Sequence, residues 1–498
     1  MTTVTGEVRD LLRLAVYTYR DQPHTVELLR RQLARLDEPL RVAIAGKVKA
    51  GKSTLLNALV GEAVAPTDAG ECTRVVTWYR DGPSPRITVH PKDGPPAALP
   101  VVRRDGALEI DLGGTPAERV DRLVVDWPAQ SLRGTTLIDT PGIASLSTDV
   151  ARRTLRLFDP DDDTPTEADA VLYLMRHLHV ADAEFLSSFS DQGVARATAV
   201  NAVAVISRAD EIGGGRVDAM LSARAIAGRY RAEPALRGLC QNVVAVAGLL
   251  AHTGRTLRAA EFTALTALAA APRDELDAAL LSADRFLTAD PGPAGLSAEL
   301  RRGLVRRFGL FGIRLATMLV RQGVRSPSTL SDELVDRSGL ADLQRVLQVQ
   351  FAQRRDLLKA RSALLALDRL LRAGGDDGRG LAAQVERILA GAHEFAELRL
   401  LGALRSGTVR LPQQLSAEAE RLLGDEGTAP ATRLGLPAEA GPETLHRVAA
   451  DLRQRWQRHA ENPMLSRRAA DACRIVVRTC EGMLNGSARP TSAPRPAS

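Results

Sequence analysis

The sequence is poor in aromatic residues and has no long apolar run. Aromatic side chains make up 3% of the 498 residues, and no basic patch is interleaved with them, so specific nucleic-acid binding is not expected. The longest apolar runs, such as 243–251, fall far short of the ~20 residues that a membrane span needs. The first residues contain no basic segment followed by an apolar stretch, so no secretory signal is predicted. We therefore expect a cytoplasmic protein that meets a membrane only from its surface.

Cysteine is also scarce. The four cysteines, Cys72, Cys240, Cys473 and Cys480, form no CxxC pair, so they are interpreted as reduced structural thiols. Hydrophobic residues make up 45% and charged residues 25%, which is ordinary for a soluble globular protein. The length exceeds what one hydrophobic core usually organises, so two or more domains are expected.

Lysine is rare as well, because arginine supplies nearly all the positive charge. There are five lysines, and three of them, Lys47, Lys49 and Lys52, fall within six residues. They belong to the segment Gly46-Lys-Val-Lys-Ala50-Gly51-Lys52-Ser53-Thr54. A short apolar run at 42–45 precedes this GxxxxGK[ST] pattern and an apolar-periodic helix follows it. That is the context a phosphate-binding loop requires.

The residue types in this loop indicate their chemistry. Gly46 and Gly51 allow the backbone to wrap a phosphate, and the loop N–H groups, with the helix N-terminus, supply a positive field. Lys52 is predicted to neutralise the β- and γ-phosphates, and Ser53 to ligate Mg²⁺.

A second element follows at Leu137-Ile-Asp139-Thr140-Pro141-Gly142. An apolar strand ends in Asp139, which is predicted to hold the metal through water, and the Gly142 N–H is predicted to sense the γ-phosphate. Alone, these residues are also compatible with a plain turn capped by the aspartate. After a phosphate loop, they favour a GTPase.

A third element reads Ile206-Ser207-Arg208-Ala209-Asp210 at the end of another apolar strand. The usual guanine-reading motif is [NT]KxD, so Ser207 and Arg208 depart from it. Asp210 is retained, and a buried acceptor at this position selects guanine over adenine. The alternative is an ordinary capping aspartate at a strand end. A last base contact is expected from the segment 243–248, at Ala247.

The first switch must supply a mobile threonine that closes on Mg²⁺ and the γ-phosphate. It lies between the phosphate loop and Asp139, in residues 65–77. Thr73 is the preferred candidate, and Thr67 and Thr77 compete with it.

Together these motifs resemble those of bacterial dynamin-like GTPases. The chain is similar to the isoniazid-inducible dynamin-like proteins of actinobacteria, and to the shorter member of that pair. The resemblance rests on GKVKAGKSTLLNALVG, the CTR of the first switch, LIDTPG and SRAD, together with extra strands near residues 86–90, 107–112 and 122–127.

The resemblance implies GTP and GDP as ligands, Mg²⁺ as the metal, and G domains that pair with a second copy or a related dynamin-like chain. It also implies a helical bundle that swings with the nucleotide and remodels membrane at the inner face of the cell membrane. By position, 46–54 bind phosphate, Ser53 and Thr73 hold the metal, Thr73 positions the water, and Asp210 reads guanine.

The phosphate loop departs from that of eukaryotic dynamins, which carry a glutamine and a serine where this chain has Val48 and Lys49. We hypothesise that the Lys49 ammonium takes the place of a recruited monovalent cation when two G domains pair. The alternative is a solvated loop lysine. A slow or inactive GTP-binding subunit that regulates a related chain is therefore the second function considered. A ribosome-assembly GTPase is disfavoured by the long helical half.

The predicted fold class is an α/β phosphate-loop GTPase domain, with a mostly parallel sheet and helices on both faces, joined to an elongated all-α bundle. The predicted domains are N-terminal helices (1–38), a GTPase domain (39–325), a helical bundle (326–485) and a disordered tail (486–498). Residues 301–321, rich in arginine, are expected to form a solvated helix of the GTPase domain. Further helices are predicted at 381–405, 413–424 and 443–484.

One loop of the predicted bundle combines apolar residues with a cation. Arg433, Leu434 and Leu436 lie in residues 427–442, and at the distal end of the bundle they would contact anionic lipid. The alternative is an ordinary surface loop.

Overall fold

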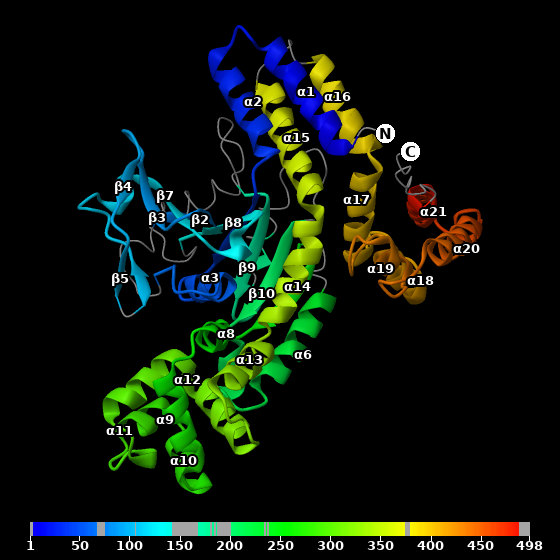
Figure 1. Cartoon of the computed structure of the whole chain (residues 1–498). Coiled ribbons are helices and arrows are strands. Elements are labelled where there is room, and N and C mark those ends of the chain that lie inside the picture. The colour runs from blue at the N-terminus through cyan, green and yellow to red at the C-terminus, as the bar shows by residue number, and fades with distance from the viewer. Residues whose placement is uncertain are drawn as a thin grey trace, which may run out of the picture.

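The computed structural model describes residues 3–66, 75–104, 106–141, 168–179, 182–183, 186, 201–233, 236, 239–373 and 379–487. A twisted sheet lies at the centre of the molecule, with the helices of residues 259–321 (α9–α12) at one end (Figure 1). The bundle formed by the helices of residues 4–35 (α1, α2) and 355–391 (α15, α16) lies at the other end. Helices α17–α21 lie to one side of this bundle.

The central sheet is mixed and mostly parallel, which confirms the predicted fold class. Its order is β11-β10-β9-β1-β8-β2-β7-β3-β4. Strand β1 pairs in parallel with β8 and β9, whereas β2 runs antiparallel to β8. The strands are β1 (Leu40–Gly46), β2 (Val76–Asp81), β3 (Arg86–Pro91), β4 (Ala97–Leu99), β7 (Val120–Trp127), β8 (Thr135–Asp139), β9 (Ala170–Met175), β10 (Ala202–Ser207) and β11 (Asn242–Val246). A separate ribbon pairs β5 (Val102–Arg104) with β6 (Ala107–Glu109).

Burial explains why the central strands are continuous apolar runs. Every residue of β9 and β10 is buried. Along β1, Ala43 and Ala45 join one hydrophobic cluster, whereas Val42 and Ile44 join a second. Because successive side chains of a strand point to opposite faces, both faces of the sheet are covered.

The helices around the sheet contribute to these two clusters. They are α3 (Lys52–Val60), α6 (Ala219–Ala232), α8 (Gly248–Arg255), α9 (Ala259–Ala270), α10 (Arg273–Ala279), α11 (Ala283–Thr288), α12 (Ala298–Arg321), α13 (Pro327–Arg337) and α14 (Leu340–Gln350). Short 3-10 turns are η2 (Ala117–Arg119), η3 (Gln130–Leu132), η4 (Ala209–Gly214), η5 (Pro293–Gly295) and η6 (Ala352–Arg354). Helix α12 is less solvated than predicted, because Leu304, Phe308, Phe311 and Ile313 are buried in the cluster.

The N-terminal helices pack on the bundle. α1 (Val4–Thr18) and α2 (Pro23–Arg35) share a hydrophobic cluster with α15 (Arg355–Ala373) and α16 (Arg379–Gly391). Pro23 begins α2, where its fixed φ and missing N–H are tolerated.

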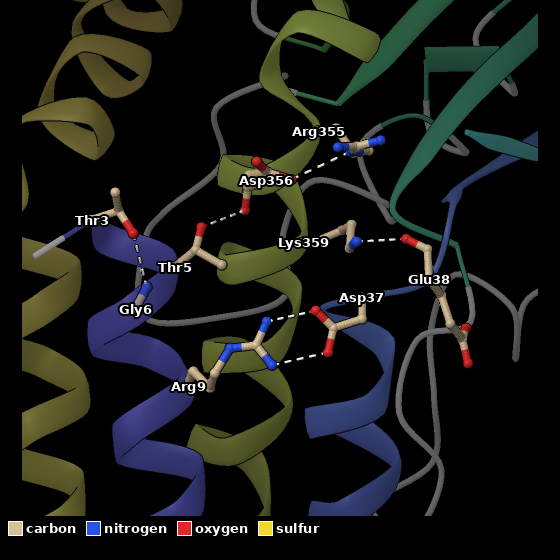
Figure 2. Close-up of polar contacts among 9 residues, drawn as sticks. All are labelled: Thr3, Thr5, Gly6, Arg9, Asp37, Glu38, Arg355, Asp356 and Lys359. Atoms are coloured by element: carbon tan, nitrogen blue, oxygen red, sulfur yellow. Dashed lines mark hydrogen bonds and ion pairs between the residues drawn. The ribbon is translucent and has the colours of Figure 1, made fainter. Parts of the chain in front are cut away.

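Polar contacts tie this bundle to the segment that enters β1 (Figure 2). The Arg9 guanidinium donates to both oxygens of Asp37, at 2.9 and 2.7 Å. From α15, Lys359 Nζ donates to the Glu38 carbonyl oxygen at 2.5 Å. Arg35 Nη2, from α2, donates to Asp169, a buried carboxylate just before β9, at 2.9 Å. The bundle is therefore anchored to the N-terminal end of β1, which carries the phosphate loop, and to the N-terminal end of the neighbouring β9.

The remaining helices are shorter than predicted. They are α17 (His393–Arg405), α18 (Gln413–Leu422), α19 (Pro430–Leu434), α20 (Pro442–Ala460) and α21 (Arg467–Ser487). The single helix predicted at 443–484 is wrong: the chain turns at residues 461–466, which include Pro463, and α21 packs back on α20. The helix predicted at 381–405 is two helices, α16 and α17, separated at Ala392. None of the described helices combines the length and the apolar character needed to cross a bilayer.

The membrane-contact prediction at residues 433–436 is not supported. Arg433 ion-pairs with the partly buried Glu397 at 2.5 Å, and Leu434 is only 4% exposed. Leu436 is partly buried against the same cluster. These side chains hold α19 onto α17 and the α20–α21 pair, so they are occupied in packing and do not form an apolar tip.

Candidate nucleotide site

The phosphate loop connects β1 to α3 as the motif predicts. Gly46 has φ +148°, and a Cβ added there would lie 2.5 Å from the Leu174 carbonyl oxygen, so the close approach of β9 requires glycine. Gly51 has φ +88° and is the N-cap residue of α3. The Ala50 N–H donates to the Lys47 carbonyl oxygen across the turn. The loop therefore ends at a helix N-terminus, the backbone arrangement that binds anions.

Lys52 points back into this loop. Its Nζ atom donates to the carbonyl oxygens of Gly46 at 3.2 Å and Lys47 at 3.3 Å. The side chain is buried, and burial lowers the pKa of Lys52 despite the opposing attraction of Asp139. The ammonium group thus stands at the centre of the loop, next to the position that phosphate oxygens would take.

Ser53 and Asp139, which their separate motifs assign to one metal, lie in contact. Ser53 Oγ donates to Asp139 Oδ2 at 2.8 Å, across 86 residues of sequence. Burial raises the pKa of Asp139, while Lys52 and the Ser53 hydrogen bond oppose that shift. Asp139 Oδ1 is buried and has no hydrogen-bond partner within the described residues. A hydroxyl and a carboxylate with an unsatisfied oxygen fit the hard oxygen ligands that Mg²⁺ prefers.

The three lysines of the loop have different surroundings. Lys47 Nζ lies 3.1 Å from Oδ1 of the buried Asp182, a residue that sequence reasoning did not identify. Lys49 is exposed and adopts a left-handed backbone conformation with φ +60°. Lys52 is enclosed by the loop. Lys49 therefore presents its charge outward.

The predicted guanine motif follows β10 and faces the phosphate loop. Ser207 Oγ donates to the Met175 carbonyl oxygen at 3.3 Å, which ties β10 to β9. Arg208 has φ +53° and pairs with Glu211 at 3.1 Å, and its Cγ atom lies 3.9 Å from a Cβ position built on Gly51. Asp210 is buried, and burial raises its pKa to about 6.

The last predicted base contact is already engaged in this structure. The Ala247 N–H donates to the carbonyl oxygen of Ser338 at 2.9 Å. Ser338 is fully buried between α13 and α14, and nothing in the sequence marked it. A base contact by the Ala247 amide therefore requires that this bond opens.

Of the three threonines considered for the first switch, Thr77 alone lies within the described residues. Thr67, Thr73 and Gly142 lie outside the described residues. Thr77 is buried within β2, where it pairs in register with Asp139. A threonine fixed in the sheet is a poor candidate for a mobile switch, so Thr73 and Thr67 remain.

The sheet, the phosphate loop and the Ser53–Asp139 pair define a phosphate-loop domain of the GTPase type. The chain matches the Dynamin family over residues 42–202. It is 44% identical over 490 residues to the isoniazid-induced protein IniC of Mycobacterium tuberculosis, covering 97% of this chain and 98% of that protein. The chain therefore belongs to the dynamin family, which confirms the resemblance found in its motifs.

Two further relatives match shorter parts of the chain. The bacterial dynamin-like protein of Nostoc punctiforme is 36% identical over 118 residues, or 21% of this chain and 16% of that protein. The isoniazid-induced protein IniA of Mycobacterium tuberculosis is 34% identical over 168 residues, or 32% of this chain and 25% of that protein.

Proposed function

We propose that this protein is a GTPase that converts GTP to GDP and phosphate with Mg²⁺. The observation that carries the proposal is the Ser53–Asp139 hydrogen bond of 2.8 Å beside the buried Lys52 ammonium. The loop amides of residues 46–54 and Lys52 bind the phosphates. Ser53 holds the metal directly and Asp139 holds it through water. Held there, Mg²⁺ would supply positive charge that offsets the charge developing on the transferred phosphoryl group.

The remaining roles follow the sequence predictions. Asp210 reads the guanine edge, with Ser207 and Arg208 beside it and the Ala247 loop opposite. Thr73 and Gly142 are the switch residues, and Thr73 also positions the attacking water. Lys49, exposed and outward-facing, acts when two G domains pair. The pairing partner is a second copy of this chain or a related dynamin-like chain.

We propose further that the protein is cytoplasmic and works peripherally, coupling pairing of G domains to movement of the helices at the inner face of the cell membrane. Helices α14 and α15 lead from the sheet into the bundle, so motion at the nucleotide has a direct path to it. In this proposal, the turn between α20 and α21 makes the lipid contact. There Met464 is 88% exposed, and the exposed Arg458, Arg467 and Arg468 flank it. An apolar tip with cations suits an anionic bilayer surface.

The test is phosphate release by the purified chain with GTP or ATP, with and without vesicles of phosphatidylglycerol and phosphatidylcholine. We expect turnover selective for GTP, raised by the anionic vesicles and abolished by Lys52→Ala. Lys92→Ala, which removes an exposed lysine outside the loop, is the matched control and should behave like the unaltered chain.

Absence of turnover despite tight GTP binding would overturn the stand-alone enzyme. It would favour the alternative of a slow GTP-binding subunit that regulates a related dynamin-like chain. The departures at Val48, Lys49 and Arg208 are the features of this sequence that would fit that result.

A further inference from the structure

Helix α12 is hydrogen-bonded to the turn that contains Asp210, the residue predicted to bind guanine. Arg314 Nη1 donates to the carbonyl oxygens of Gly214 at 3.1 Å and Gly215 at 2.5 Å. Its Nη2 atom donates to the carbonyl oxygen of Leu280. The carbonyls of Gly214 and Gly215 close the η4 turn, which begins one residue before Asp210. One guanidinium therefore ties that turn both to α12 and to the residue that follows α10.

The turn has little stiffness of its own. Gly213, Gly214 and Gly215 have φ of +63°, +72° and +69°, and residues 213 and 214 are exposed. Three consecutive glycines give a chain great conformational freedom when it is not restrained. Within the turn, only the Gly215 N–H bond to the Ile212 carbonyl oxygen, at 3.3 Å, restrains these glycines among the hydrogen bonds of the described residues, and the Arg314 hydrogen bonds add a restraint from outside.

The same helix also breaks where it faces the Asp210 carboxylate. Gly309 has φ +59° and ψ 178° inside α12, a conformation open essentially to glycine alone. A Cβ built on Gly309 would lie 4.0 Å from Asp210 Oδ2 and 3.8 Å from Leu249 Cδ2. On either side of the break, Phe308 and Phe311 are buried in the core beneath the sheet. The break thus sits at a fixed place next to the carboxylate.

Position matters here because guanine recognition depends on two hydrogen bonds to one carboxylate. A buried acceptor discriminates between bases only if it meets its donors, and small displacements of a positioned group weaken that discrimination. Asp210 is followed by the flexible glycines, so its carboxylate needs a fixed support.

We propose that Arg314 is a positioning residue for guanine recognition, holding the Asp210 turn against α12 in the orientation that reads the base. This inference rests on the proposed function, in which Asp210 contacts guanine. Arg314 itself touches no substrate in this proposal. It acts through the carbonyl oxygens of Gly214 and Gly215.

A matched control lies on the same helix. Arg321 Nε donates to the Ala269 carbonyl oxygen and its Nη2 to the Ala271 carbonyl oxygen, both at 2.9 Å. It anchors α12 to the end of α9 through two backbone carbonyls, as Arg314 anchors α12 to η4. Losing Arg321 therefore reports the effect of loosening the helix without releasing the Asp210 turn.

The experiment compares the unaltered chain, Arg314→Met, Arg314→Lys and Arg321→Met by titration with GDP and with inosine diphosphate. Inosine keeps the N1–H donor but lacks the 2-amino group. We expect Arg314→Met to weaken GDP binding about tenfold and inosine diphosphate binding less, so that the preference for GDP shrinks. Arg314→Lys keeps one hydrogen bond, so its nucleotide affinities should lie between those of the unaltered chain and those of Arg314→Met. Arg321→Met should keep both affinities within about twofold.

Kinetics provide a second readout that a purely structural role would not give. Arg314→Met should raise KM for GTP by about the same factor as the loss of GDP affinity, with kcat at saturation within about twofold. Equal weakening of GDP and inosine diphosphate, or an effect matched by Arg321→Met, would overturn the inference. Should Arg314→Met not fold, Arg314→Lys carries the same comparison. A lack of GDP preference in the unaltered chain would instead overturn guanine reading by Asp210, and this inference with it.

Discussion

Lys47 Nζ lies 3.1 Å from Asp182 Oδ1, and this pair fixes one side of the phosphate loop to the segment after β9. Asp182 is 1% exposed and also accepts hydrogen bonds from Tyr173 Oη at 2.7 Å and from the His179 N–H at 2.9 Å. Burial raises the pKa of Tyr173, with a further contribution from the carboxylate. The Lys47 ammonium is therefore engaged in a structural ion pair. Lys52, by contrast, lies inside the loop, and Lys49 is exposed outside it.

The first prediction concerns this pair. Asp182→Asn keeps the shape of the side chain but removes the negative charge that both Lys47 and Tyr173 contact. Hydrogen bonds to charged groups contribute about 1.5–3 kcal/mol to the free energy of unfolding. Because Lys47 is partly solvated, we expect the substitution to lower the unfolding free energy by an amount near the lower end of this range. Urea unfolding would measure it. A double-mutant cycle with Lys47→Met should give a coupling of about 0.5–1 kcal/mol, and strict additivity would contradict the pairing.

The second prediction concerns Asp210, whose pKa is raised to about 6 by burial. In the unfolded chain the pKa of this carboxyl is near 3.9, so between about pH 4 and pH 6 the folded state binds more protons than the unfolded state. The unfolding free energy therefore falls as pH rises through this window and stays lower above it. Asp210→Asn removes the free-energy cost of burying an ionised carboxylate. Without ligand, the variant should therefore be more stable than the unaltered chain at about pH 8, by roughly 2–3 kcal/mol.

The same substitution should abolish stabilisation by GDP, because the amide cannot accept both guanine donors. Thermal unfolding at about pH 5 and pH 8, with and without GDP, separates the two effects. In the unaltered chain, GDP affinity should decline below about pH 6, as the carboxylate becomes protonated. A ligand-free Asp210→Asn variant that is less stable at the higher pH would argue against the burial of an ionised Asp210.

The third prediction concerns Lys49, which combines an exposed side chain with φ +60°. Lys49→Gly relieves a left-handed conformation that costs other residues about 1–2 kcal/mol, so it should stabilise the fold. It should also lower turnover at saturating GTP by about tenfold or more, since the positive charge that pairing of two G domains would bring to the transition state is lost. Lys49→Ala lacks the backbone relief but should show the same kinetic loss. GDP affinity should change by less than about threefold in both variants. Normal turnover in both would mean that Lys49 is a solvated loop lysine.

How far the sequence predicts this molecule depends on how local each feature is. The phosphate loop, Asp139 and Asp210 could be predicted as site residues because strand, turn and helix follow one another within a few residues. The Ser53–Asp139 contact followed from the motifs, since parallel strands place their carboxyl ends at one edge of a sheet. Arg314, by contrast, reaches Gly214 across 100 residues, and only tertiary packing brings the two together.

The errors in these predictions have different physical origins. The break between α20 and α21 contains Pro463, a helix-stopping signal that the strong apolar periodicity of 443–484 concealed. The break at Ala392 has no proline. The membrane loop was misassigned because Leu434 and Leu436 look like an exposed tip in sequence, whereas the Arg433–Glu397 ion pair places them in a core. Apolar side chains near a cation do not reveal in sequence whether they face solvent or a partner helix.

The last prediction follows from that correction. Met464 is 88% exposed at the turn between α20 and α21, with Leu465 partly buried behind it. Transfer of a methionine side chain from water to an apolar phase is worth about 1.5–3 kcal/mol, so Met464→Asp should weaken binding to phosphatidylglycerol vesicles about tenfold or more. Leu281→Asp is the control, because Leu281 is also an exposed apolar residue, at 64%, but lies just after α10, in the group of helices at the opposite end of the sheet from the bundle. Vesicle co-sedimentation should leave Leu281→Asp unchanged, and turnover without vesicles should be the same for both variants. Equal losses in the two would show that the α20–α21 turn is not the lipid contact.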